Sequence, residues 1–134
     1  MEGGAHDASV WLRRFNAAYA RKLVMPIFPG SLNLRVPRPF DWSHARYAEY
    51  LMRFDRAEYG GERDILLLPC RLASLNGHAA WLWTTTTPRE GDARCVVEII
   101  TDVSLRATYG LEDGDTVRVD ILQRDPGSCA PRPV

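Results

Sequence analysis

The chain has 134 residues, 46% of them hydrophobic and 25% charged, a length and a composition that indicate one globular domain rather than a disordered protein. Lysine plus arginine and aspartate plus glutamate number 17 each, so the net charge is zero. A neutral chain has no overall field that attracts nucleic acid or an anionic membrane, and any anion site must therefore be local.

The cysteines indicate no disulfide framework and no metal site. Cys70, Cys95 and Cys129 are an odd number and widely spaced, without the paired C-x-x-C spacing of zinc or redox motifs, and we expect reduced thiols. The first nine residues are small and polar, and nowhere does an apolar run approach the length of a signal sequence or a membrane span. We therefore expect a cytoplasmic protein without membrane contact.

The first element expected in chain order is a helix. Apolar residues recur at helical spacing from Trp11 to Leu23, and Asp7 or Ser9 is available as the N-cap. The helix must end before Pro26, because a residue that precedes proline is pushed out of the helical conformation.

A turn and a strand follow at the segment Pro-Gly-Ser-Leu-Asn, residues 29–33. Apolar and polar residues alternate from Leu32 to Val36, the pattern of a half-buried strand. Ser31 and Asn33 are two apart on an extended backbone and point the same way, which places a hydroxyl beside an amide. These residue types are also those of ordinary turns, so the local sequence by itself favours a turn that leads into a strand.

The middle of the chain predicts a helix and a strand. An apolar stripe over 47–54, with Asp41 or Ser43 as cap, indicates a second helix packed on the outside of a sheet. The apolar run 65–72 indicates a buried strand that is interrupted at Pro69 by the proline or by a bulge.

A hairpin and a polar loop come next. The dipeptide at 76–77, Asn-Gly, is a strong hairpin signal, and the return strand is expected at 79–84 with Trp81 and Trp83 on one face. Four threonines, residues 84–87, then lead into the polar loop 88–94.

The most apolar strand of the chain is expected at 95–100, and Glu98 is its anomaly. A carboxylate inside such a run must reach a partner, a ligand or solvent, because burying it alone costs free energy. Two readings stay equally open at this point: a functional carboxylate, or a side chain that faces water at a sheet edge.

The last elements are a short helix and a strand. The helix is expected over 104–109, with Asp102 as cap and Gly110 as the residue that ends it. A final strand is expected at 117–122, and residues 125–134 are predicted to be a disordered tail.

These elements predict the fold class mainly β (α+β), a small β-barrel with peripheral helices in one domain over residues 1–124. Strands and helices do not alternate regularly, which excludes a Rossmann core, and no glycine-rich phosphate motif is present. The three histidines lie near no nucleophile motif, so the sequence does not support Ser-His-Asp catalysis. From the residues alone, the prediction stops at a small barrel with a candidate polar site.

Three stretches occur together in an order that resembles one family. They are Phe-Pro-Gly-Ser-Leu-Asn-Leu-Arg-Val at 28–36, Val-Glu-Ile-Ile-Thr-Asp-Val-Ser-Leu-Arg at 97–106, and Gly-Leu-Glu-Asp-Gly-Asp-Thr-Val at 110–117. Together with Leu-Pro-Cys-Arg-Leu at 68–72, they resemble the archaeal-type CTP-dependent riboflavin kinases over roughly residues 28–122. The resemblance implies a cradle-loop β-barrel that transfers the γ-phosphoryl group of CTP to the ribityl hydroxyl of riboflavin and gives FMN.

The resemblance also implies roles for individual residues. Ser31 and Asn33 would ligate Mg²⁺, and Asn33 and Glu98 would be the catalytic residues, with Glu98 also binding the flavin and accepting the proton of the attacking hydroxyl. Thr87 would be a second flavin contact. The nucleotide contacts would include the four residues that match the family segment after the carboxylate: Val103, Ser104, Leu105 and Arg106.

Gly3 and Gly4 stand where the family has a glycine-rich nucleotide loop, and the resemblance makes them further nucleotide contacts. The expected partners are riboflavin and CTP, bound by a monomer that contacts neither nucleic acid nor membrane. Two alternatives are a non-catalytic barrel that binds a flavin or nucleotide or regulates another enzyme, and a swapped-hairpin DNA-binding regulator. The zero net charge and the lack of a basic stripe count against the DNA-binding regulator.

Overall fold

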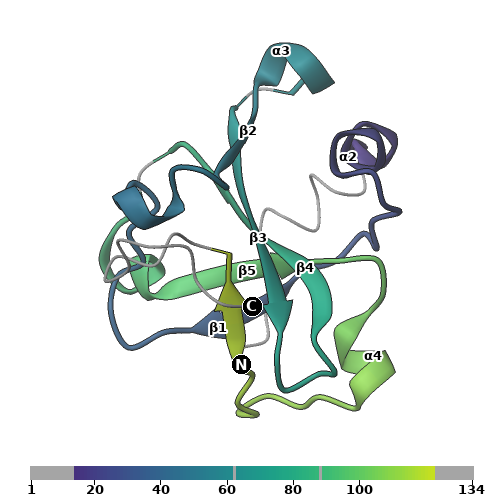
Figure 1. Ribbon diagram of the computed structural model, residues 1–134, viewed down its shortest axis with the longest axis vertical. Helices are drawn as coiled ribbons and strands as arrows, with labels where there is room; N and C mark the ends of the chain where they lie inside the picture. The colour runs from purple at the N-terminus through teal and green to yellow at the C-terminus, as the bar shows by residue number, and fades with distance from the viewer. Residues whose placement is uncertain (1–13, 62, 88, 123–134) are drawn as a thin grey trace, which may run out of the picture.

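The computed structural model describes residues 14–61, 63–87 and 89–122. Within these residues, six strands form one antiparallel sheet that curls into a half-barrel, with short helices at its margins (Figure 1). The prediction of a mainly-β barrel with peripheral helices is confirmed. The strands are β1 (Leu32–Arg35), β2 (Met52–Phe54), β3 (Ile65–Leu72), β4 (His78–Thr85), β5 (Val96–Ile100) and β6 (Val119–Ile121). The helices are α2 (Asn16–Leu23), α3 (Arg56–Tyr59) and α4 (Leu105–Tyr109), with 3-10 turns η1 (Ala45–Tyr47) and η2 (Gly91–Cys95).

Strand β3 organises the sheet, whose order is β1-β5-β4-β3-β2 with β6 also on β3. One side of β3 pairs with β4 along its whole length. The other side pairs with β2 over Ile65–Leu67 and with β6 over Cys70–Leu72. Pro69 lies in the gap between these two partners, and its carbonyl accepts a hydrogen bond from Leu122 N at 3.0 Å. A proline can occupy this position because the missing N–H would point into the gap, so β3 continues without the predicted interruption.

The alternation of side chains divides the core between the two faces of the sheet. On β5, Val97 and Ile99 point into the half-barrel, where they join one buried cluster. Ile100 points to the opposite face, where it packs with Tyr19 and Trp83 in a second cluster beneath α2 and α3. By the same alternation Glu98 lies on the face that α2 covers.

The two turn predictions are confirmed in their backbone geometry. Asn76 and Gly77 both have positive φ, 57° and 65°, as the central residues of a hairpin turn between β3 and β4. Gly110 ends α4 in the left-handed conformation with φ 65°. The predicted cap of this helix was wrong, because Ser104, and not Asp102, accepts the hydrogen bond from Ala107 N.

The second predicted helix is wrong. The segment 43–54 forms the short turn η1 and then strand β2, which pairs with the first half of β3. The aromatic stripe at helical spacing misled the prediction, since Phe54 is buried by strand pairing opposite Ile65 and by ring contacts with Tyr19. The turn is capped by His44, whose Nδ1 accepts from Arg46 N at 3.1 Å, in place of the predicted Asp41 or Ser43.

Other boundaries differ by a few residues. Helix α2 is described from Asn16, and the expected helix start with its caps Asp7 and Ser9 lies outside the described residues. The predicted tail 125–134 also lies outside them. Strand β5 begins at Val96, and the final strand covers only Val119–Ile121.

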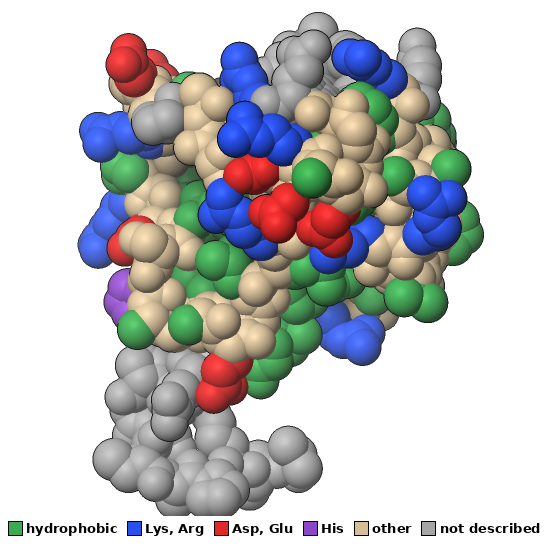
Figure 2. All heavy atoms as spheres, turned by 90° about the horizontal axis from the view of Figure 1, so that it is seen from above, with side chains coloured by type: hydrophobic (Ala, Val, Ile, Leu, Met, Phe, Trp, Pro, Cys, Tyr) green, Lys and Arg blue, Asp and Glu red, His purple; other side chains and the backbone are tan. Residues whose placement is uncertain are grey.

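The end of the molecule that carries α3 has mixed charges. Figure 2, which views this end, shows acidic side chains gathered among lysines and arginines. Two of the ion pairs on β2, α2 and α3 join Arg53 to Asp55 and Lys22 to Glu58, each at 2.8 Å. Exposed pairs of this kind contribute at most about 1 kcal/mol each. No helix among the described residues is both long and apolar enough to pass through a membrane.

Candidate functional site

One row of side chains crosses three strands on the face that α2 covers. Glu98 on β5 lies directly opposite Asn33 on β1 and opposite Trp83 on β4. Directly opposite residues of antiparallel strands have their Cβ atoms about 5 Å apart, so the three side chains are neighbours. The sheet register therefore brings together two residues, Asn33 and Glu98, that are 65 positions apart in the sequence and were both predicted for the site.

Glu98 is a buried carboxylate with charged and polar neighbours. Its side chain is 1% exposed, and Oε2 accepts a hydrogen bond from Arg89 Nη2 at 2.8 Å. Ser31 Oγ lies 3.4 Å from Glu98 Oε1. The reading of Glu98 as a water-facing edge residue is therefore wrong, whereas its reading as a functional carboxylate stays a prediction.

Asn33 carries the unusual feature of the site. The residue is 3% exposed, and its Oδ1 makes no hydrogen bond with any part of the chain that the structure describes. A buried acceptor without a partner costs about 1–3 kcal/mol, and such atoms are rare in folded proteins. Because Asn33 lies beside Glu98 and two residues after Ser31, a ligand or cation bound at this place could supply the partner that Oδ1 lacks.

Two buried aromatic residues, Tyr19 on α2 and Trp83 on β4, join this row to the helix that covers it. Trp83 Nε1 donates a hydrogen bond to Tyr19 Oη at 2.7 Å, and both residues are essentially inaccessible to solvent. Burial is the main cause that raises the pKa of the Tyr19 hydroxyl far above its ordinary value, and the negative charge of Glu98 raises it further. Tyr19 therefore stays neutral and acts as a structural support next to the carboxylate.

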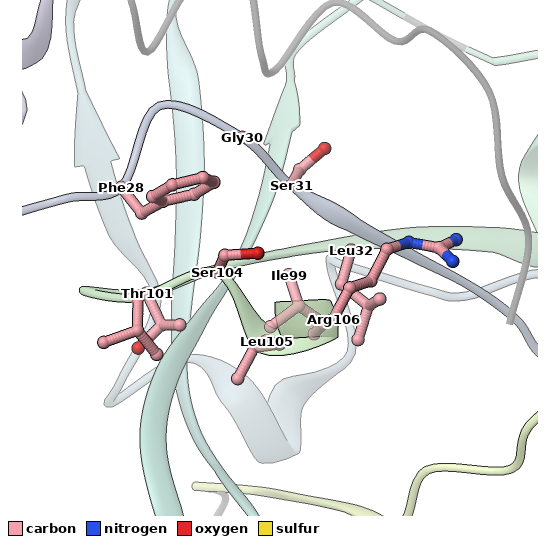
Figure 3. Close-up of a pocket in the computed structure, with 10 residues that line it drawn as sticks. Phe28, Gly30, Ser31, Leu32, Ile99, Thr101, Ser104, Leu105 and Arg106 are labelled. Atoms are coloured by element: carbon pink, nitrogen blue, oxygen red, sulfur yellow. The ribbon is translucent and has the colours of Figure 1, made fainter. Parts of the chain in front are cut away.

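A cavity of about 120 Å³ lies where β1 begins, next to the turn before α4. We call it the Ser31 cavity. Figure 3 shows Phe28, Gly30 and Ser31 on one wall and Ser104, Leu105 and Arg106 on the other, with the Ser31 hydroxyl directed away from Ser104. The structure thus brings the predicted nucleotide residues 103–106 to the same cavity as Ser31.

Hydrogen bonds hold the segment before α4 against the β3–β4 hairpin. His78 Nε2 lies 2.8 Å from Asp102 Oδ1, and His78 Nδ1 lies 2.9 Å from Tyr109 Oη at the end of α4. Thr101 Oγ1 donates to Ala79 O at 2.7 Å. The hydrogen bond from His78 is the main cause that holds the pKa of Asp102 below its ordinary value of 3.8. Both ends of the segment that forms one wall of the Ser31 cavity are therefore anchored.

Arg106 forms an ion pair with an aspartate in the connection between α4 and β6. Its Nη2 lies 2.7 Å from Asp113 Oδ1, and the arginine side chain is partly exposed. Arg106 lines the Ser31 cavity, so this pair places a guanidinium at its margin. A charged ligand in the cavity would compete with Asp113 for this cation.

A second and larger cavity, of about 680 Å³, is lined in part by Arg89. Its lining combines hydroxyls from residues 84–87 with the rings of Phe40 and Trp42, which meet edge to face at a centroid distance of 5.2 Å. We call it the threonine cavity. Thr87, the predicted flavin contact, lines this cavity and not the Ser31 cavity, and Arg89 lines it as well.

The remaining predicted residues have different outcomes. Val103 lines the Ser31 cavity with its neighbours, whereas Gly3 and Gly4 lie outside the described residues. No group of three or more histidine, cysteine, aspartate or glutamate side chains that could hold a metal ion is found among the described residues. A cation here would need hydroxyl, amide and ligand oxygens instead, and Ser31 Oγ and Asn33 Oδ1 are of the type that Mg²⁺ accepts.

The sequence prediction missed Arg89 and the His78 cluster. A signal for Arg89 was present, since a carboxylate inside an apolar strand requires a partner and the loop 88–94 just before that strand contains two arginines. For His78, no local pattern indicated that Asp102 and Tyr109 lie within hydrogen-bonding distance of its ring.

Comparisons of the sequence with known proteins found one family model and two curated relatives. The family model described as domain of unknown function DUF120, with the short name CTP-dep_RFKase, matches residues 2–121. A curated relative from Archaeoglobus fulgidus, named "Riboflavin kinase", is 28% identical over 116 residues, which are 84% of this chain and 48% of the relative. Another from Methanothermobacter thermautotrophicus, also named "Riboflavin kinase", is 28% identical over 123 residues, 90% of this chain and 94% of the relative. The chain thus spans about half the length of the first relative and nearly all of the second.

Proposed function

Because the chain belongs to the CTP-dependent riboflavin kinase family, we propose that it is a phosphotransferase that makes FMN from riboflavin, with CTP as the donor and Mg²⁺ as the metal. The bond between the γ-phosphorus and the bridging oxygen breaks, and a bond forms to the ribityl hydroxyl oxygen. The hydroxyl proton leaves, and CDP is the second product. Such a reaction needs groups that position the two substrates and offset charge, and little covalent chemistry from the protein.

The observation that carries this proposal is the free Oδ1 of the buried Asn33, beside Ser31 and the carboxylate of Glu98. Ser31 Oγ and Asn33 Oδ1 would hold Mg²⁺, together with phosphate oxygens of the donor. When bound, the metal offsets the negative charge of the phosphate oxygens. A buried amide oxygen without a partner costs free energy, and this cost is explained if a bound ligand or metal contacts the oxygen in the working enzyme.

The Ser31 cavity supports the placement of the nucleotide. Its walls carry Ser31 from the proposed metal pair and the segment 103–106, so a nucleotide in this cavity would lie near the hydroxyl of Ser104 and the guanidinium of Arg106. A guanidinium is suited to phosphate oxygens because it offers several parallel donors. Gly3 and Gly4 stay proposed as additional nucleotide contacts.

The threonine cavity supports the placement of the flavin. Its volume falls in the usual range of ligand pockets, about 300–1,000 Å³. The rings of Phe40 and Trp42 can pack on a planar ring system, and the hydroxyl of Thr87 can hydrogen-bond to its polar edge. Arg89 lines this cavity and contacts Glu98, so a flavin bound here would have its ribityl chain on the side of the carboxylate.

Glu98 is the group that would take the proton of the attacking hydroxyl. A general base must lie within hydrogen-bond reach of the proton that it accepts, and Glu98 adjoins Ser31 and Asn33, where the phosphates would be held. Residues 1–124 would act as one monomeric domain in the cytoplasm, with riboflavin and CTP as the small-molecule substrates and no nucleic acid.

The experiment that tests this function incubates the protein with riboflavin, Mg²⁺ and CTP and separates the flavins by chromatography. We expect FMN with CTP, and less or none when ATP or GTP replaces it. The matched control is Glu98→Gln, which keeps the shape of the side chain and removes its charge, and which should make no FMN. Quenching of flavin fluorescence without FMN under any donor would contradict catalysis and favour the binding-only barrel.

A further inference from the structure

We infer that Arg89 is a positioning residue that neutralises Glu98, and that this neutralisation allows an anionic nucleotide to approach Ser31 and Asn33. The inference rests on the proposed function, because it concerns how the donor is bound. The observation behind it is that a nearly inaccessible carboxylate lies 3.4 Å from Ser31 Oγ and directly opposite Asn33 in the sheet. The groups proposed to hold the metal and its phosphates therefore adjoin a negative charge.

Coulomb repulsion from Glu98 would oppose binding at this place. A nucleoside triphosphate stays anionic after it has bound one divalent cation, and two like charges about 8 Å apart in a partly hydrated site repel by an amount that weakens binding tenfold or more. A cation adjacent to Glu98 removes most of this repulsion. Arg89 is such a cation, since a guanidinium is charged at every physiological pH.

The geometry of Arg89 fits a fixed role. Nη2 donates to Glu98 Oε2 at 2.8 Å, and Nη1 donates to the carbonyl of Val96 at 3.2 Å. Two hydrogen bonds to β5 from one guanidinium hold its plane in place, which a single contact would not do. The side chain is about one-quarter exposed, so its charge is partly screened and yet remains beside the carboxylate.

Arg89 also orients the carboxylate. Because Oε2 is engaged by Arg89, the other oxygen, Oε1, is the one that faces Ser31. Oε1, which accepts from Ser31 Oγ at 3.4 Å, is then the oxygen that would take the proton of the ribityl hydroxyl. Arg89 thus lines the threonine cavity and holds one oxygen of the carboxylate that lies beside Ser31, so it sets both the charge and the orientation of the proton acceptor.

The test measures CTP binding by calorimetry in the presence of Mg²⁺ and without riboflavin, so that affinity is separated from turnover. We expect Arg89→Gln to weaken CTP binding about tenfold or more, and Arg89→Lys to restore much of the affinity because it restores the charge. The double variant Arg89→Gln with Glu98→Gln should bind CTP within about threefold of wild type, because the repulsion is gone, and should make no FMN. Arg118→Gln changes an exposed arginine just before β6; it is the matched control and should bind like wild type.

The double variant separates this role from a structural one. If Arg89 only held the loop in shape, removing Glu98 as well would not recover CTP binding, and that result would overturn the inference. Unchanged binding in Arg89→Gln would overturn it too, while FMN formation by the wild type would leave the proposed function in place. Failure of the wild type to bind CTP with Mg²⁺ would overturn both.

Discussion

Replacement of Asn33 by alanine tests the site most directly, because Oδ1 is buried and has no partner among the described residues. We expect Asn33→Ala to abolish FMN formation while the thermal stability of the ligand-free protein changes little. Alanine removes an unsatisfied acceptor, whose burial costs about 1–3 kcal/mol, and it also loses packing of similar size around the truncated side chain. These two contributions oppose each other, so the net change in unfolding free energy should stay within about 1 kcal/mol.

The expected size of the ligand effect follows from linkage. A ligand at about 100 times its dissociation constant stabilises the folded state by about 2.7 kcal/mol. For a domain of this length that corresponds to a rise in Tm of roughly 10 °C. We expect this rise in wild type when CTP and Mg²⁺ are added together, and we expect most of it to be lost in Asn33→Ala.

The assay is differential scanning fluorimetry with and without CTP and Mg²⁺, beside FMN formation by chromatography. Glu49→Ala is a suitable control, because Glu49 is exposed and lines neither the Ser31 cavity nor the threonine cavity. Two results would refute the reasoning. One is a ligand-free variant that melts more than about 8 °C below wild type, which would make Asn33 a structural residue, and the other is a variant that keeps the full rise with CTP and Mg²⁺.

Three further predictions concern stability. Val24 is 88% exposed and has a left-handed φ of 54°, which a β-branched residue adopts only with strain. Val24→Gly should therefore raise the free energy of unfolding, measured by urea denaturation, by about 1 kcal/mol. A lower free energy of unfolding would contradict this account. Tyr19→Phe should cost about 1–3 kcal/mol in the same assay, since Trp83 Nε1 would lose its buried acceptor, and no change would contradict that account. The hydrogen bond from His78 holds the pKa of Asp102 below 3.8, so the unfolded chain binds more protons at this carboxyl than the folded one. The stabilisation of the folded state by this pair is therefore present above pH 3.8 and is lost as the pH falls through the lowered pKa. Asp102→Asn should accordingly flatten the acid side of the stability profile, and a profile like that of wild type would contradict this role.

The sequence was informative where local chemistry decides the structure. The Asn-Gly pair at 76–77 predicted the hairpin because both residues tolerate positive φ, and Gly110 ended α4 for the same reason. Alternation predicted that Ser31, just before β1, and Asn33 point the same way. It could not say that the facing strand is β5, because pairing between residues 33 and 98 is set by the closure of the whole sheet.

The failed helix over 43–54 shows where local patterns are overridden. Its aromatic residues recur at helical spacing. However, one edge of β3 over Ile65–Leu67 would have no hydrogen-bonding partner if this segment were a helix, and β2 provides that partner. Phe54 then packs against Tyr19 and Tyr59, which belong to two different helices. A requirement set by another strand cannot be read from the segment itself, so the tertiary structure decided between two patterns that the sequence permits.

The same reasoning explains why the site is built on a strand that otherwise serves the core. Inside the half-barrel, Val97 and Ile99 of β5 contribute apolar surface, and these contacts hold the strand in register with β1. On the other face that register places Glu98 beside Asn33, and a shift by one residue would exchange the two sets of side chains. The core therefore positions the carboxylate more rigidly than a loop could. The loop before β5 adds Arg89, the charge that makes a buried carboxylate compatible with an anionic substrate.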